Sequence, residues 1–390
     1  MSSTPPTPLR VLFIMKNMAM GGISKVACQY LAALQREPSI RLTALILAPV
    51  RDAWAVEFLS SHHIVYESGF LSETWAKNTF FLWKWALKTR VHFQKKTLAA
   101  KLNPILAAHD VVLDFSNCES FPFIRHAGKP MLGWAHCNFA TFQKNTAYKI
   151  SLPEYACMVG LTDNFCREYR ETYPALAQKV VRLYNPIDVE SVRRAAEEQG
   201  GDLIPEPYFI SVQRLSAEEK ATHTIISAFA RFQKRHPEYH LCIVGDGPQR
   251  DELRAQAAGV PHITFTGSIP NPMPLIKGAT GLILSSTMKV GEGLGYVLAE
   301  SQALGVLAIA ADVRSGPADI LLDGKAGYLF EAESVDSLEE TLCRAVECPQ
   351  TSAQKVAFAT EQLGRFAVEN IIADLLRILH NIHHAHSHDS

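Results

Sequence analysis

The 390-residue sequence lacks several patterns that would place it quickly in a class of protein. Its eight cysteines include no C-x-x-C pair, which argues against a disulfide framework or a zinc ribbon and favours a reduced, cytosolic protein. No stretch reaches the ~18 consecutive apolar residues of a membrane-spanning helix. The early apolar run Val11–Met15 is too short for the core of a signal peptide. There is no G-x-x-x-x-G-K-[S/T] loop, so a P-loop NTPase is also excluded.

Charge is scarce overall but unevenly distributed. The net charge is −1, yet residues 1–187 hold 21 Lys and Arg against 12 Asp and Glu, whereas residues 188–390 hold 17 against 27. Two separate electrostatic characters thus share one chain, whose length at roughly 100–200 residues per domain predicts two domains. The basic half favours an anionic partner, such as nucleic acid, anionic lipid or a phosphorylated substrate, although a chance imbalance between solvated surfaces is the alternative.

Short β-branched or aromatic runs alternate with helical patterns along the chain. Runs without polar alternation are typical of strands covered on both faces, so the sequence predicts an α/β fold of two doubly wound, Rossmann-like domains. We expect domains at 1–187 and 188–365, a helix over 366–382 within the longer helical segment Glu361–Ile382, and a disordered tail at 383–390. The predicted strands are Val11–Met15, Arg41–Leu47, Val111–Phe115, Met131–Trp134, Tyr155–Leu161, Tyr208–Val212, His240–Val244, Ile263–Thr266, Gly281–Ser285 and Val306–Ala310.

The segment from Trp75 to Lys101 departs from this pattern. It contains seven basic residues, no acidic one, and three of the five tryptophans. Aromatic rings at headgroup level and lysines facing anionic lipid would hold such a helix on a membrane surface. A helix that packs its aromatics on the domain core is an equal alternative. Nucleic acid is a weaker one, because no recognised reading motif accompanies the charge.

The glycine-rich run from Gly291 to Gly295 follows a predicted strand and opens a predicted helix near Leu294 or Gly295. Glycines permit a tight loop close to a ligand, and a helix N-terminus attracts phosphate. Glu292 stands in this loop, and Glu300 one to two turns into the helix. Carboxylates accept hydrogen bonds from vicinal hydroxyls, so the pattern indicates a ligand with sugar hydroxyls on both sides of a phosphate.

Positive charge for a diphosphate comes from Arg214 and Lys220, which follow the first strand of the second half. Ligands of doubly wound sheets bind at the carboxyl ends of strands, where this pair would lie. A dinucleotide dehydrogenase is disfavoured, because Gly245 and Gly247 are not followed by the third glycine of G-x-G-x-x-G.

These residues together resemble the GT-B glycosyltransferases, specifically the large retaining family 4 that includes bacterial lipopolysaccharide and capsule transferases. Glu292 and Glu300 match its E-x7-E motif, and Arg214 and Lys220 match its basic pair for the donor diphosphate. The remaining matches are the strand-end turn at Gly245, Gly247 and Pro248, and the pattern Ser315–Ile320 followed by Gly324 and Gly327.

The first half resembles the family more weakly. Gly21 and Gly22 match a glycine loop that approaches the donor phosphates and the acceptor, and His136 matches a strand-end histidine that faces the sugar, or is a structural residue. The run from Asn185 to Asp188 is similar to the family's interdomain turn. Lys25 departs from the pattern, because many relatives have Glu or Arg there.

The resemblance implies a retaining enzyme that moves a hexose or N-acetylhexosamine from UDP to a lipopolysaccharide, capsule or lipid-linked glycan, with GDP and ADP as open alternatives. A metal-dependent GT-A transferase would normally carry an Asp-x-Asp pair to hold its cation, and the sequence contains none. The resemblance implies no metal or other cofactor. We expect a cytoplasmic protein, peripheral on the anionic inner face of the cytoplasmic membrane. No nucleic-acid partner is expected. A non-catalytic nucleotide-sugar-binding subunit is the alternative. The implied catalytic residues are Glu292, Arg214, Lys220 and His136; the implied donor-binding residues are Gly21, Gly22, Gly245, Gly247, Pro248, Gly293, Leu294, Gly295 and Glu300.

Overall fold

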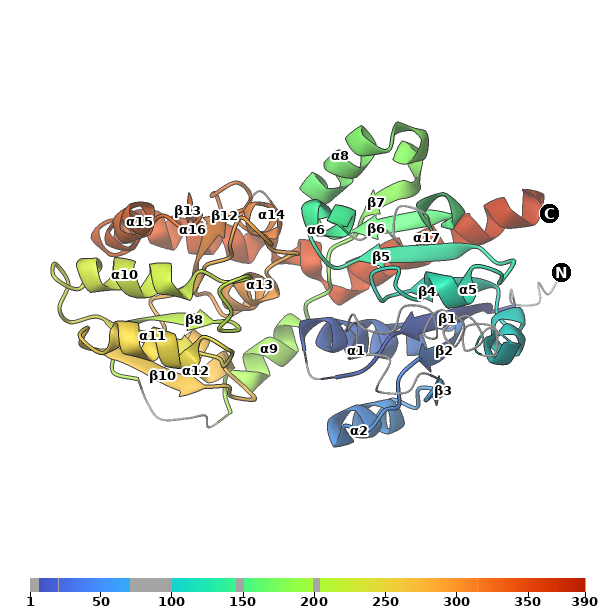
Figure 1. Ribbon diagram of the computed structural model, residues 1–390, viewed down its shortest axis with the longest axis horizontal. Helices are drawn as coiled ribbons and strands as arrows, with labels where there is room; N and C mark the ends of the chain where they lie inside the picture. Colours follow the sequence, from blue (N-terminus) through green and yellow to red (C-terminus); the bar gives the residue numbers. More distant parts are fainter. Residues whose placement is uncertain are drawn as a thin grey trace, which may run out of the picture.

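The computed structural model describes residues 7–19, 21–70, 98, 100–144, 151–198, 204–313 and 315–389. Within these ranges the chain forms two α/β domains, each built on one parallel sheet (Figure 1). The predicted α/β fold of two doubly wound domains is therefore confirmed. The predicted membrane segment 75–101 lies outside the described residues except for Leu98, Ala100 and Lys101.

The first domain contains a seven-stranded sheet in the order β3-β2-β1-β4-β5-β6-β7, and every neighbouring pair is parallel. In β1, Val11 and Phe13 pack on one face while Leu12 and Ile14 pack on the other. Burial on both faces explains why the strands read as continuous apolar runs. The strands are β1 (Leu9–Met15), β2 (Ile40–Ile46), β3 (Tyr66–Ser68), β4 (Val111–Asp114), β5 (Met131–Ala135), β6 (Cys157–Gly160) and β7 (Val180–Arg182).

Helices cover both faces of this sheet. One face receives Val26, Tyr30 and Leu34 of α1. The other receives Phe142 of α6 and Phe165 of α8. The helices are α1 (Gly22–Gln35), α2 (Ala53–Ser61), α5 (Phe121–Ile124), α6 (Phe139–Lys144) and α8 (Asp163–Thr172), with 3-10 turns η1 (Leu152–Glu154) and η2 (Pro174–Lys179).

The second domain contains a six-stranded parallel sheet in the order β10-β9-β8-β11-β12-β13. Its strands are β8 (Tyr208–Val212), β9 (His240–Val244), β10 (Ile263–Gly267), β11 (Gly281–Leu284), β12 (Leu307–Asp312) and β13 (Tyr328–Glu331). Its helices are α9 (Val189–Ala195), α10 (Thr222–Phe232), α11 (Arg250–Ala257), α12 (Met273–Lys277), α13 (Tyr296–Ala303), α14 (Gly316–Ile320), α15 (Val335–Glu347) and α16 (Pro349–Glu361).

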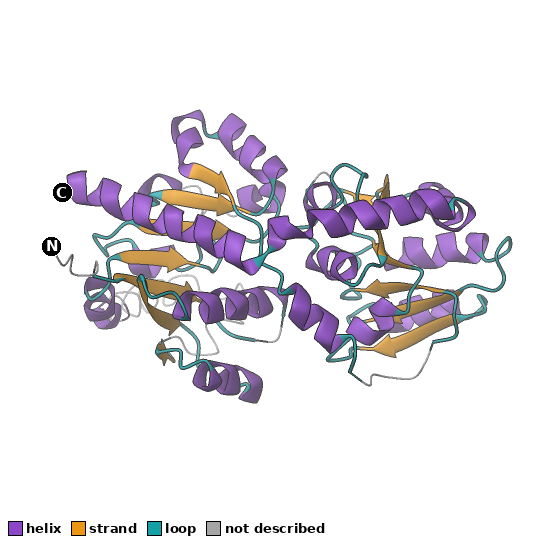
Figure 2. Ribbon diagram, turned by 180° about the vertical axis from the view of Figure 1, so that it is seen from behind, coloured by secondary structure: helices purple, strands orange, loops and turns teal. Residues whose placement is uncertain are grey.

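The C-terminal segment returns to the first domain as α17 (Val368–Asp389) (Figure 2). Leu375 and Leu379 are fully buried in the same core as α1. The single helix expected over Glu361–Ile382 is wrong, because the 3-10 turn η3 (Gln362–Phe366) and the extended Ala367 separate α16 from α17.

The tail expected to be disordered at 383–390 is helical as far as Asp389. Adding one residue to an existing helix costs little, and Ser387 Oγ donates to the His383 carbonyl at 2.9 Å. No helix in the described ranges combines the length and apolarity needed to cross a bilayer.

Candidate functional site

Three polar side chains meet where β8 and β11 end. Lys220 follows β8 and pairs through its backbone with Ser286, which follows β11. Lys220 Nζ donates to Ser286 Oγ at 3.0 Å and also bonds Glu292 Oε2, while Ser286 Oγ donates to that same carboxylate oxygen at 2.7 Å. The Lys220 and Glu292 side chains are only 14% and 19% exposed. The structure thus unites two of the predicted residues and adds Ser286, which the sequence interpretation missed.

The loop that carries Glu292 depends on its glycines. Gly291 and Gly295 have φ of 70° and 80°, in the left-handed region that favours glycine. Helix α13 begins at Tyr296 with Gly295 as its N-cap, one to two residues later than predicted. The Leu294 side chain is buried in the core, so only its backbone is available to the predicted donor site.

The first domain packs directly on this loop. Asn138 Nδ2 donates to the Val290 carbonyl, Thr141 Oγ1 donates to the same oxygen at 3.1 Å, and Lys144 Nζ donates to the Lys289 carbonyl at 3.2 Å. A Cβ on Gly293 would lie 2.3 Å from the His136 carbonyl oxygen. The carboxyl ends of β5 and β11 therefore face each other, with the Glu292 loop between the domains.

His136 stands at the end of β5, where the resemblance places a histidine. Its ring lies 4.3 Å from the Phe115 ring and stacks at 6.1 Å on Trp134. Its Nε2 lies 3.0 Å from the Phe115 carbonyl oxygen, which can only accept, so Nε2 carries a proton. Burial lowers the pKa of His136 to about 4, so the ring is neutral at pH 7 and its Nδ1 is an acceptor.

We expect acidification to destabilise the protein through His136. The pKa in the folded chain is about 4, below the ~6.5 of an unfolded chain, so the unfolded state binds more protons between these values and stability falls as the pH is lowered. Urea unfolding at pH 7 and pH 4.5 should show that His136→Gln loses less stability than the wild type, by on the order of 1–3 kcal/mol.

The exposed His126 supplies the control for this measurement, because His126→Gln should behave as the wild type. Asp114 has the opposite effect on the pH dependence of stability, because burial raises its pKa to about 6. This effect is the same in the wild type, His136→Gln and His126→Gln. Equal losses in His136→Gln and the wild type would contradict the assignment of a neutral ring.

Glu300 lies on α13 opposite the first domain. Burial raises the pKa of Glu300, and the positive charge of Lys25 on α1 partly opposes this rise. The adjacent Tyr296 fixes α13 to the first domain, because its hydroxyl donates to the Pro186 carbonyl at 2.8 Å and accepts from Gln29 Nε2 at 2.7 Å. Lys25, the residue that departs from the family pattern, thus acts electrostatically on the second motif glutamate.

Arg214 does not join the cluster of Lys220 and Glu292. Its side chain is 65% exposed and pairs with Glu219 at 3.6 Å. The turn after β9 supports the backbone around it, since a Cβ on Gly245 or Gly247 would lie 1.9 Å or 2.2 Å from the carbonyl oxygens of residues 213 and 215. Pro248 in the same turn is exposed. These glycines are thus required for packing of the loop that presents Arg214.

Gly21 and Gly22, unlike Gly245 and Gly247, do not pack closely against other residues. Both are exposed at the start of α1, and a Cβ on either would meet nothing within 4 Å. The packing of the described residues therefore does not explain why glycine stands at these two positions. Open space at a helix start leaves room for a ligand to approach the backbone.

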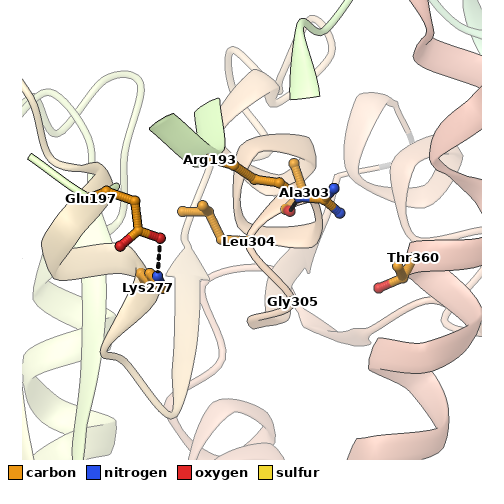
Figure 3. A pocket seen from close by; sticks show the side chains of 7 residues that line it. All are labelled: Arg193, Glu197, Lys277, Ala303, Leu304, Gly305 and Thr360. Carbon is orange, nitrogen blue, oxygen red and sulfur yellow. Dashed lines mark hydrogen bonds and ion pairs between the residues drawn. The ribbon is translucent and has the colours of Figure 1, made fainter. Parts of the chain in front are cut away.

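A hollow of about 300 Å³ lies at the opposite end of α13, away from Glu292 (Figure 3). Its charged groups already have partners, because Lys277 pairs with Glu197 at 2.5 Å and Arg193 Nε donates to the Ala303 carbonyl at 3.2 Å. Ala303 ends α13, where a cation interacts favourably with the helix dipole. These interactions are structural.

One group of possible metal ligands occurs within the described part of the chain, formed by His236, Cys343 and Glu347. Arg235 bonds Cys343 Sγ at 3.3 Å and Glu347 at 2.7 Å, so a guanidinium already supplies the positive charge there. Cys343 and Glu347 lie on α15, and His236 lies in the segment after α10, outside the Glu292 cluster.

Comparison with known proteins agrees with this geometry. Residues 194–362 match the family model "Glycosyl transferases group 1". The match spans most of the second domain. Anabaena Alr3699/HepE, solved in complex with UDP and glucose, superposes with a TM-score of 0.74 and 18% identity over 96% of this chain and 100% of its own. The outer core galactosyltransferase WaaB superposes with a TM-score of 0.67 and 18% identity over 94% and 99%. These likenesses show the GT-B fold.

Characterised relatives match part of this chain in sequence. The phosphatidyl-myo-inositol mannosyltransferase of Mycolicibacterium smegmatis is 26% identical over 256 residues, which cover 62% of this chain and 64% of the relative. The lipopolysaccharide 1,6-galactosyltransferase of Salmonella typhimurium is 26% identical over 178 residues, which cover 44% and 47%. The chain therefore matches less than two thirds of the length of either relative.

Proposed function

We propose that this protein is a retaining glycosyltransferase of family 4 that transfers a hexose or N-acetylhexosamine from a UDP-sugar to a glycan or glycolipid. The observation that carries the proposal is the bonded group of Lys220, Ser286 and Glu292, held between the domains of a GT-B fold. An acid, a cation and a hydroxyl at this position suit a ligand that carries both sugar hydroxyls and phosphate.

The donor would lie on the second domain. Lys220 and Arg214 neutralise its diphosphate together with the free N–H groups at the start of α13. Glu300 accepts hydrogen bonds from the ribose hydroxyls, and the turn from Gly245 to Pro248 lies beside the base. The complexes of the structural neighbour HepE with UDP and with UDP-glucose support UDP as the nucleotide.

Transfer would proceed by attack on one face of the sugar. The bond between the anomeric carbon and the β-phosphate oxygen breaks, and the acceptor oxygen bonds to that carbon on the same face. The departing phosphate oxygen takes the proton of the acceptor hydroxyl, so the configuration is retained. Lys220 and Arg214 stabilise the charge that grows on the phosphate, which is where most of the rate gain arises. Glu292 and the neutral His136 position the sugar.

Closure of the first domain over the second would exclude water from the activated sugar. The first domain would bind the acceptor, which we propose to be a lipopolysaccharide, capsule or lipid-linked glycan. The likeness to the Salmonella lipopolysaccharide 1,6-galactosyltransferase supports an envelope glycan. The basic aromatic segment 75–101 supports a location on the cytoplasmic face of a membrane. No metal or other cofactor is included in this proposal.

A thermal-shift panel of UDP, GDP, ADP and their sugars tests the donor. A ligand that binds only the folded state adds about 2.7 kcal/mol of stability at 100 times its Kd. We expect UDP and one UDP-sugar to raise Tm most, and Glu300→Gln to reduce this shift without changing the Tm of the free protein by more than a few degrees.

The best donor of the panel then enters a turnover assay, because release of UDP distinguishes an enzyme from a nucleotide-sugar-binding subunit. Affinity without release of UDP, even in the presence of acceptor glycans, would contradict the proposed activity. A larger Tm shift with GDP or ADP than with UDP would overturn the choice of uridine as the base. The description of the fold of the site would not change.

A further inference from the structure

The side-chain amide of Asn138 has one end bonded within the first domain and the other end bonded to the second. The Asn138 carbonyl accepts from the Phe142 N–H at 3.0 Å, and its Oδ1 accepts from the Thr141 N–H at 2.8 Å. This is the hydrogen-bonding pattern of a helix N-cap. The Nδ2 of the same side chain donates to the Val290 carbonyl, in the loop before Glu292. One residue thus fixes the start of α6 and joins α6 to the second domain.

The loop that receives this bond is a tight turn. The Gly291 N–H donates to the Thr287 carbonyl at 2.7 Å, and this hydrogen bond closes the turn. The carbonyls of Lys289 and Val290 lie inside the turn, and both accept from side chains of the first domain. Gly291, with its φ of 70°, ends the turn directly before Glu292. The backbone that leads into Glu292 is therefore held from the other domain.

Helix α6 supplies two further donors to this turn. Thr141 Oγ1 donates to the Val290 carbonyl at 3.1 Å, and Lys144 Nζ donates to the Lys289 carbonyl at 3.2 Å. A carbonyl oxygen has two lone pairs, so the Val290 oxygen accepts from Asn138 and Thr141 together. While the two domains are packed, α6 and the turn therefore form one hydrogen-bonded unit.

The Glu292 side chain, in contrast, is held within its own domain. Its carboxylate bonds Lys220 and Ser286, and its backbone N–H donates to Ser315 Oγ at 3.3 Å. The second domain thus fixes the carboxylate, whereas the first domain fixes the turn that precedes it. The position of Glu292 in the site depends on both.

The contact with α6 is reversible, because the turn lies near the surface. Lys289 is exposed and Val290 is half-buried. Water can therefore replace the α6 donors when the domains separate, and neither carbonyl is left buried without a partner. The bonds from α6 depend on the packing of the domains, whereas those from Lys220 and Ser286 do not.

We propose that Asn138 is a positioning residue, which couples the packing of the two domains to the placement of Glu292 during transfer. Asn138 acts through the Val290 carbonyl and not on the sugar itself. When the domains pack, its amide holds the turn, and Glu292 is fixed for reaction; when they separate, the turn is released. The inference rests on the proposed glycosyltransferase function, to which it adds a residue of the first domain.

Asn138→Asp separates the two roles of this side chain. The variant keeps an oxygen for the Thr141 N–H, so α6 retains its N-cap, but it places an acceptor against the Val290 carbonyl. We expect kcat for release of UDP with acceptor to fall by at least about tenfold, while the donor KM and the Kd for UDP stay within about twofold. Tm should remain within a few degrees of the wild type.

Thr141→Val is the second variant, because it removes the other donor to the same oxygen and adds no charge. We expect a loss in kcat of roughly three- to tenfold. The double variant should lose less than the product of the two single losses, because both donors share the Val290 carbonyl.

Asn271→Asp is the matched control. Asn271 Oδ1 accepts from the Met273 N–H at 3.1 Å and its Nδ2 donates to the Ala195 carbonyl at 2.7 Å, so it has the same two roles within the second domain alone. Its other partner, Glu198, is exposed, so solvent screens the added charge. We expect kcat within about twofold of the wild type.

Hydrogen exchange gives a readout that does not depend on turnover. In the full chain saturated with UDP, the peptide that spans residues 287–292 should exchange faster in Asn138→Asp than in the wild type or in Asn271→Asp. Equal exchange in the three proteins would overturn the coupling, and so would wild-type kcat in a folded Asn138→Asp or a loss of UDP affinity in step with kcat. If the wild type binds UDP but never releases it from a donor, the proposed function fails, and the exchange rates alone decide the coupling.

Discussion

Lys220→Ala should lower kcat by roughly 10²–10³, the loss typical of one charge-stabilising donor at a reacting centre. Lys220 is the mostly buried cation that bonds both Ser286 and Glu292. Its ammonium is therefore fixed before the donor binds, and in the proposed reaction it meets the charge that develops on the leaving phosphate. The measurement is steady-state release of UDP in the presence of an acceptor.

Lys277→Ala is the matched control for this change. Lys277 belongs to the same domain and also pairs with a glutamate, Glu197, but it lies at the far end of α13. We expect activity within about twofold of the wild type, because exposed ion pairs contribute only ~0–1 kcal/mol. Half or more of the wild-type kcat in a folded Lys220→Ala protein would contradict the role given to Lys220.

Gly293→Ala should reduce kcat/KM by about 10²-fold while UDP affinity changes little. The added Cβ would lie 2.3 Å from the His136 carbonyl oxygen, which belongs to the backbone of the other domain and cannot turn aside. The domains must then separate at this point, and a misplacement of ~1 Å at a reacting centre can cost 10²-fold in rate. Small-angle scattering with UDP should show a less compact particle than the wild type.

Gly259→Ala provides the same chemical change without the clash, since a Cβ there meets nothing within 4 Å. It should match the wild type in scattering and in rate. Full activity in Gly293→Ala would mean that the contact between Gly293 and His136 is not part of the reactive arrangement.

The sequence predicted the fold well in the interior of the two sheets. All ten predicted strands are present, whereas β3, β7 and β13 were missed. None of these three strands is buried along its whole length, and β3 is exposed throughout, so they lack the continuous buried run that identifies a central strand. β3, β7 and β13 are edge strands, where neighbours are present on one side only.

The candidate site was predicted less completely, because its partners are distant in the chain. Glu292 and Lys220 were found by motif and do meet. Ser286 carried a usable signal, since it follows a buried strand on the same sheet edge as Lys220. Asn138 carried none, because no spacing in the sequence indicates that it bonds Val290 in the other domain.

Helix α17 has a consequence for the order of assembly during synthesis. Its buried residues, including Leu375 and Leu379, complete the core under α1, although they are made after the whole second domain. The core of the first domain, which is synthesised first, is therefore incomplete until residues 368–389 have left the ribosome. Until then the apolar face that α17 covers has no partner from this helix.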